Sequence, residues 1–180
     1  RKYIGACAFN DCLNLKNIKL GSALESIGER AFSKCPNIQR YEISKPSEKF
    51  YVDEAGTLLE KNYHKYYTYG KTGLRLISYP CGSSAMSYTI SKDVVSIDGD
   101  AFDGCSNLKQ LYVEDGNSYY TTDSLALYDF DSENEDYSCG FDLILTKKNR
   151  YTVPKTITAN GIEIPVIFVA CPIANNPENP

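Results

Sequence analysis

The sequence predicts a β-rich solenoid, in which short parallel strands stack on one another, with two inserted β-hairpins. Three observations lead to this fold class. A segment recurs at a spacing of 23 residues, and two longer spacers recur with the same internal order. The 180 residues are also 42% hydrophobic and 23% charged, which is the composition of an ordinary globular protein rather than of a disordered or coiled-coil chain.

The first element is a repeat that begins at Ile4 and returns at Ile27 and Ile97. Its aligned phenylalanine and cysteine positions are Phe9 and Cys12, Phe32 and Cys35, Phe102 and Cys105, and Phe168 and Cys171. Within a single domain over residues 1–180, we expect copies near residues 4–26, 27–49 and 97–118, and a degenerate copy at 157–174. Such internal similarity is typical of repeat architectures.

Each of the three clean copies ends in a short strand that alternates between apolar and polar residues, whereas the degenerate copy lacks this strand. In the first copy Ile18 and Leu20 share one face and Lys19 lies on the other. A unit of about 23 residues cannot bury its own apolar face, so the copies are expected to stack with their strands parallel and with few helices. Stacking predicts an internal column of the four aligned phenylalanines.

The inserts at residues 50–90 and 119–153 each predict a β-hairpin. Each begins with an aromatic extended run, turns at Glu54–Gly56 or at Thr122–Ser124, and returns through a segment rich in Leu and Ile. Apolar runs bounded by Gly, Asn, Asp and Ser are typical of hairpin strands.

The seven cysteines divide into two groups. Four lie in the repeat column, where packing explains them, since a free cysteine behaves as a small buried hydrophobe. The other three are Cys7, Cys81 and Cys139. A bond between Cys81 and Cys139, one in each hairpin region, is the disulfide that the sequence suggests. No C-x-x-C pair occurs, so a zinc site has no support.

No catalytic, cofactor-binding or metal-binding residue is predicted. His64 is the single histidine, and its neighbours offer no nucleophile or orienting group. The Asp98–Asp103 segment resembles a calcium loop only faintly, because the closing glutamate is missing. The acidic run Asp129–Asp136 is interpreted as a solvated loop, with adventitious calcium binding as the weaker alternative. A net charge of −4 argues against nucleic acid as a partner, and no segment is apolar enough to insert into a membrane.

The repeat I-G-x-x-A-F-x-x-C-x-x-L-x-x-I-x-L, followed by G-x-L-L and L-I-S-Y-P inserts, resembles the BspA-type leucine-rich repeat family over Ile4 to about Asn160. The resemblance implies a β-rich leucine-rich-repeat solenoid and an extracellular or cell-surface location. It also implies a role in adhesion to host or matrix proteins. Because only three clean copies are present and no export signal is seen, we expect a segment of a longer or processed protein.

Two groups of residues are predicted to bind a partner. The first faces outward on the predicted strands, and the second crowds the tip of the first hairpin. They are Asn17, Lys19, Arg40, Glu42, Gln110 and Tyr112 on the strands, and Tyr63, Tyr66, Tyr67 and Tyr69 at the tip. Three roles stay open: a protein-binding adhesin segment, which is favoured, a carbohydrate-binding module that uses the tyrosines, and a structural spacer.

Overall fold

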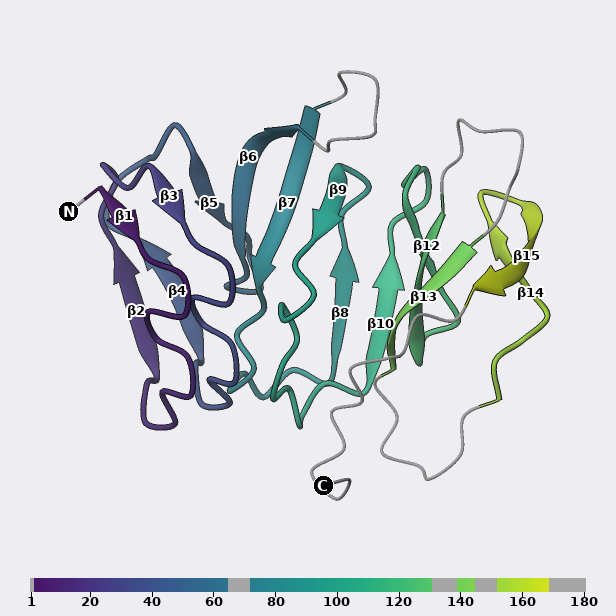
Figure 1. The fold of residues 1–180 in the computed structure, drawn as a ribbon, viewed down its shortest axis with the longest axis horizontal. Helices are drawn as coiled ribbons and strands as arrows, with labels where there is room; N and C mark the ends of the chain where they lie inside the picture. Colours follow the sequence, from purple (N-terminus) through teal and green to yellow (C-terminus); the bar gives the residue numbers. More distant parts are fainter. Residues whose placement is uncertain (1, 65–71, 131–138, 145–151, 169–180) are drawn as a thin grey trace. The chain divides into compact units, whose positions relative to one another are not determined.

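The computed structural model describes residues 2–64, 72–130, 139–144 and 152–168, and every regular element in these ranges is a β-strand (Figure 1). The chain divides into two compact units. The N-terminal unit contains residues 1–85 and 95–107, and the C-terminal unit contains residues 86–94 and 108–180. The predicted fold class, a β-rich leucine-rich-repeat solenoid with few helices, is confirmed.

Two parallel ladders join the first two repeat copies in the N-terminal unit (Figure 1). The paired strands are β1 (Tyr3–Ile4) with β3 (Ser26–Ile27), and β2 (Asn17–Leu20) with β4 (Arg40–Ile43). Every pair in these ladders is 23 residues apart, for example Lys19 with Glu42. One copy is therefore one coil of the solenoid, as the spacing predicts.

Apolar side chains from successive coils fill the interior of the N-terminal unit. Tyr41 is fully buried and Ile38 is 1% exposed. Phe32 is also buried, and its ring stacks on that of Phe9 with centroids 5.4 Å apart. The predicted aromatic column therefore exists between these two coils. Phe9 is nevertheless 38% exposed, because no described coil covers its other face.

The first hairpin lies within a four-stranded sheet of order β5-β6-β7-β9. Its strands are β5 (Phe50–Val52), β6 (Leu58–His64), β7 (Thr72–Ser78) and β9 (Val94–Ile97). The predicted turn at Glu54–Gly56 joins β5 to β6. Gly56 has a φ of +83°, and an added Cβ would lie 3.0 Å from Cγ of Arg40. Its carbonyl accepts a hydrogen bond from the Tyr41 N–H at 3.2 Å, so the turn continues the sheet beside β4.

A largely buried ion-pair network connects this hairpin to the segment that follows β9. Arg75 on β7 donates from Nε and Nη2 to the two carboxylate oxygens of Asp98, at 2.6 and 2.8 Å, and from Nη1 to Glu60 at 3.1 Å. All three side chains are between 13% and 16% exposed. The guanidinium is therefore satisfied by two carboxylates in a site largely withdrawn from water.

A further coil lies where the sequence analysis placed the end of the first insert. In the C-terminal unit β8 (Ser87–Ile90) pairs in parallel with β10 (Gln110–Val113), again at a spacing of 23. The insert predicted at 50–90 therefore contains a repeat strand, and its hairpin occupies only the first part. Tyr79 stands 23 residues before Phe102 and packs on it with ring centroids 5.6 Å apart. Tyr79 and Gly82 stand where the repeat has Phe and Cys, so the Phe and Cys pattern did not predict this copy.

The second hairpin is part of a five-stranded sheet of order β11-β12-β13-β15-β14. Its strands are β11 (Tyr120–Thr122), β12 (Ala126–Phe130), β13 (Cys139–Ile144), β14 (Thr156–Ala159) and β15 (Ile162–Phe168). The region predicted as a degenerate copy at 157–174 instead begins with an antiparallel hairpin of β14 and β15. Asn160 and Gly161 form its two-residue turn with φ of 50° and 79°, as a type I′ turn requires. Cys171 lies outside the described residues.

The disulfide predicted between Cys81 and Cys139 is wrong, because Cys81 is bonded to Cys105. The two Cα atoms are 4.2 Å apart, at a sequence separation of 24, because they lie on successive coils. Cys105, which was predicted to be a free cysteine packed in the core, is therefore disulfide-bonded instead. Cys35 keeps that role: it is 2% exposed, and its thiol donates to the Phe9 carbonyl at 2.9 Å. Among the described residues Cys7, Cys12 and Cys35 are free thiols.

Replacing both Cys81 and Cys105 by Ser should lower the free energy of unfolding by about 3 kcal/mol, because the bond restricts the unfolded chain over a separation of 24 residues. Urea denaturation of the oxidised protein and the double variant measures the difference. Cys7→Ser, which alters an exposed free thiol, is the control. Equal unfolding midpoints for oxidised and reduced wild type would contradict the prediction.

Candidate binding surface

Four of the predicted binding residues lie together on the outward face of the N-terminal unit. Their strands alternate strictly: Ile18 and Tyr41 point into the core, while their neighbours are exposed. The register places the four exposed residues in two cross-strand pairs, Asn17 beside Arg40 and Lys19 beside Glu42. The outward strand residues of this face therefore carry mixed charge.

The other two predicted strand residues lie in the C-terminal unit, on the outward face of β10. Gln110 and Tyr112 are both exposed, and Tyr112 retains 43% of its accessible surface. Their cross-strand neighbours are Ser87 and Thr89, which are exposed too. Ser87 and Thr89 were not predicted, because their coil has Tyr79 and Gly82 where the repeat has Phe and Cys. The signal was available, since Ser87 and Thr89 precede Gln110 and Tyr112 by the repeat spacing.

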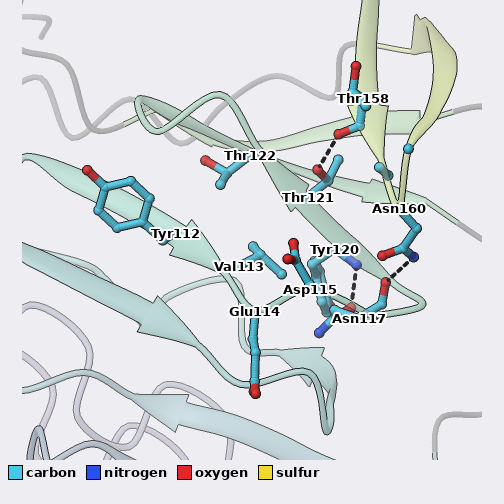
Figure 2. Close-up of a pocket in the computed structure, with 12 residues that line it drawn as sticks. Tyr112, Val113, Glu114, Asp115, Asn117, Tyr120, Thr121, Thr122, Thr158 and Asn160 are labelled. Carbon is cyan, nitrogen blue, oxygen red and sulfur yellow. Dashed lines mark hydrogen bonds between the residues drawn. The ribbon is translucent and has the colours of Figure 1, made fainter.

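A pocket of about 660 Å³ opens beside Tyr112 in the C-terminal unit (Figure 2). It lies where β11 contacts both β10 and β14. Residues 112–115 form one wall, residues 158–161 the other, and residues 120–122 contribute from β11. The volume is within the range of about 300–1,000 Å³ typical of ligand sites. Sequence reasoning could not find this pocket, because three separate segments create it.

Two asparagines fix the pocket walls (Figure 2). The side chain of Asn117 is 2% exposed, donates to the carbonyls of Ser91 and Val94, and accepts from the N–H groups of Tyr119 and Tyr120 at 2.8 Å. Asn160 in the β14–β15 turn donates to the Asn117 carbonyl at 3.0 Å. It also accepts from the N–H of Gly116 at 3.0 Å. The two walls are therefore hydrogen-bonded to each other.

The predicted tyrosine cluster is described only at Tyr63. Its half-buried ring lies under the guanidinium of Arg75, with Cζ 5.3 Å from the ring centroid. Tyr63 therefore packs against the ion-pair network. Tyr66, Tyr67 and Tyr69 lie outside the described residues.

The described part of the chain holds no group of three or more His, Cys, Asp or Glu side chains arranged to bind a metal ion. His64 is an exposed residue at the end of β6. Within the same ranges, no helix is long and apolar enough to cross a membrane.

Comparison with known proteins identifies the repeat. The BspA type leucine rich repeat region matches residues 1–54 and 78–136, in six copies. The chain belongs to the BspA-type leucine-rich repeat family. The second matched range includes β8, in agreement with the additional coil. Members of this family are repeat proteins.

Two solved structures resemble this BspA-type domain. A leucine-rich cell surface protein from Faecalibacterium prausnitzii A2-165 is 25% identical, with a TM-score of 0.54 over 65% of this chain and 28% of that one. The pneumococcal vaccine antigen PcpA shares the fold at 23% identity, with a TM-score of 0.55 over 64% of this chain and 26% of that one. The chain thus spans less than a third of either protein. No curated protein sequence matches it significantly.

Three aspartates, Asp98, Asp100 and Asp103, lie close together in the BspA-type copy that begins at Ile97. Burial raises the pKa of Asp98 above its usual range, against the opposing effect of Arg75. Burial also raises the pKa of Asp100, and the nearby charges of Asp98 and Asp103 add to the effect. The Asp103 carboxylate accepts a hydrogen bond from the Ser33 hydroxyl at 3.0 Å. The segment that faintly resembled a calcium loop is thus a set of partly buried carboxylates.

Acidification should stabilise the native state through Asp100. Its pKa is raised in the folded protein, so its favourable contribution is present at low pH and is lost as pH rises through the folded pKa. Asp100→Asn removes this titration. We expect the variant to be more stable than wild type near neutral pH and the difference to shrink towards about pH 4. Urea titrations at several pH values measure this, and a constant difference would contradict it.

Proposed function

We propose that this chain is a non-enzymatic protein-binding module of a secreted or cell-surface protein, and that its role is adhesion to host or extracellular-matrix proteins. The observation that carries the proposal is the alternation in the ladder strands β2, β4, β8 and β10. Inward residues at their centres are buried, and their outward neighbours are exposed. The outward side chains are not needed for packing, so they are available for recognition.

The chemistry of the outward residues favours a protein partner. Lys19 and Arg40 are basic, Glu42 is acidic, and Tyr112 offers a rigid aromatic surface with a hydroxyl group. A single-sign basic surface, which nucleic acid would require, is missing from these described strands.

The disulfide supports an extracellular location. Disulfides such as Cys81–Cys105 persist in oxidising compartments and are rare in the cytosol of most organisms. The F. prausnitzii relative is described as a cell surface protein. We infer the same location for the protein that contains this chain.

Binding of the purified chain to immobilised extracellular-matrix and serum proteins, beside a glycan array, tests the proposal. The face variant is Lys19→Ala/Glu42→Ala, combined with Tyr112→Ala. The matched control, Lys2→Ala/Glu25→Ala, removes an exposed pair of the same charges, bridged at 2.8 Å, away from these strands. We expect saturable binding to a protein that the face variant loses and the control retains. Binding to glycans alone would indicate a carbohydrate module, and no binding would indicate a spacer.

A further inference from the structure

The strand β10 has one edge that is only partly paired. The N–H groups of Gln110 and Glu114 donate to Met86 and Ile90, so the even-numbered residues bond towards β8. Successive residues of a strand bond in opposite directions. Leu111 accordingly faces the other way, where its N–H donates to Ser124 at 2.9 Å and its carbonyl accepts from the Thr122 hydroxyl at 3.2 Å.

Val113 continues this outer edge, and among the described residues it has no such partner. It is the next residue that directs its N–H and carbonyl away from β8, and it lines the pocket. Neither group bonds to another residue in the part of the chain that the structure describes. The N–H and the carbonyl of Val113 thus face the pocket in the positions from which a strand bonds to a neighbouring strand.

The opposite wall presents the backbone of β14. The two-residue turn makes Ala159 and Ile162 a hydrogen-bonded pair, so the preceding residue Thr158, opposite Glu163, directs its backbone groups away from β15. Its carbonyl accepts the Thr121 hydroxyl at 2.9 Å (Figure 2). The pocket therefore lies between two strand edges, with β11 in contact with both strands.

The pocket also carries an uncompensated negative charge. Figure 2 shows the Asp115 carboxylate on the side of Thr121 and Thr122, while Glu114 extends away. The Glu114 carboxylate accepts the Lys92 N–H at 2.9 Å and the Ser91 hydroxyl at 3.4 Å. Asp115 has no ion-pair partner among the described residues, and none of the residues lining the pocket there is basic.

We propose that this pocket binds an extended peptide segment of the partner protein, with a lysine or arginine side chain at Asp115. The segment pairs its backbone with Val113, as in the strand additions by which sheet edges bind peptides. Its basic side chain reaches Asp115, and its apolar stem lies against the exposed ring of Tyr112. This inference rests on the proposed protein-binding function and names the chemistry of its ligand.

Two features favour a peptide over a sugar. The N–H and carbonyl of Val113 are free among the described residues. An extended peptide can bond to both of them, with its own carbonyl and N–H groups. The carboxylate without a basic neighbour favours a cation, whereas neutral sugars carry none. A saccharide is the alternative outcome of the test.

Selection of random nonapeptides displayed on phage against the intact chain tests the inference. We expect selected peptides to share a Lys or Arg flanked by alternating β-branched residues. Synthetic peptides are then titrated against wild type, Asp115→Asn and the control Asp93→Asn, which alters an exposed aspartate of the same unit. Asp115→Asn should weaken binding about three- to tenfold, and Asp93→Asn should not. Peptides methylated at one backbone nitrogen each, position by position, should lose binding when the methylated N–H faces β10. Because successive residues of a strand face opposite ways, the sensitive positions should alternate along the peptide.

The backbone amide signal of Val113 in ¹⁵N-labelled protein provides a readout of location. It should shift on addition of the selected peptide and stay unchanged with the methylated one. Peptides that bind independently of Asp115, a Val113 signal that does not move, or recovery of no peptide would overturn the inference. A glycan that shifts Val113 when peptides do not would overturn it in favour of a sugar. If the matrix-protein panel binds through Lys19 and Glu42 while Asp115→Asn has no effect, the proposed function stands and this inference fails.

Discussion

Phe32→Ala should lower the free energy of unfolding by about 3–5 kcal/mol, the cost typical of emptying a buried aromatic site. Phe32 is 5% exposed, stacks on Phe9, and packs on Tyr41 in a T-shaped arrangement with ring centroids 5.3 Å apart. Its loss leaves a cavity between two coils that also support each other through the β2–β4 ladder. Because each coil of a solenoid contacts mainly its neighbours, the damage weakens the interface between these two coils.

Phe9→Ala is the matched control for that experiment, since the two rings occupy the same repeat position. Phe9 is 38% exposed, so its truncation removes less buried area and leaves an open notch rather than a cavity. Urea denaturation followed by circular dichroism should show a clearly smaller loss for Phe9→Ala. Equal losses would show that burial in the column does not determine the contribution of each phenylalanine.

Arg75→Met should also cost about 3–5 kcal/mol, since it leaves the largely buried carboxylate of Asp98 without its cation and Glu60 with only the more exposed Lys49. Glu60 and Asp98 are 13% and 15% exposed, and Arg75 hydrogen-bonds to both. The methionine preserves much of the volume but supplies no donor. Part of the loss should be recovered on acidification, because burial raises the pKa of Asp98 and protonation neutralises this carboxylate.

Lys49→Met is the control for the network. Lys49 also approaches Glu60, at 3.4 Å, but its side chain is 44% exposed and its pairing is screened by water. We expect a change of about 0–1 kcal/mol, measured by the same urea titration near neutral pH. If Lys49→Met and Arg75→Met were equally destabilising, burial of the Arg75 network would not be the source of its contribution.

The repeat spacing predicted the parallel ladders because a fixed period places the same residue types at the same height in each coil. It failed at Tyr79, where a tyrosine takes the place of the phenylalanine that defines the pattern. The β14–β15 hairpin has a clear local signal in Asn160-Gly161 between alternating apolar residues, but the Phe168 and Cys171 spacing in the same region also matches the repeat, which predicted a further copy instead. Sequence patterns thus predicted a coil correctly in the three clean copies, where the residue types that define the repeat were all present.

The disulfide and the pocket depend on distances that a linear pattern does not contain. Cys81 meets Cys105 only because one coil separates them, and the strand of that coil, β8, lies within the region that the sequence predicts to be an insert. Pairing by hairpin number therefore selected the wrong partner, Cys139. The pocket likewise requires Val113, Thr121 and Thr158 to come together from three strands. The outward strand residues were accessible to prediction because alternation alone determines their direction.

The bond between Cys81 and Cys105 changes how the chain transmits a pulling force. Tension entering from either end passes directly through the two sulfur atoms, so the residues between them carry none of it. At roughly 3.4 Å per extended residue, a separation of 24 keeps about 80 Å of chain from being drawn out. Strand β8 and its outward side chains Ser87 and Thr89 lie inside this protected loop. In an oxidising environment, part of the exposed sheet is thereby shielded from tension along the chain.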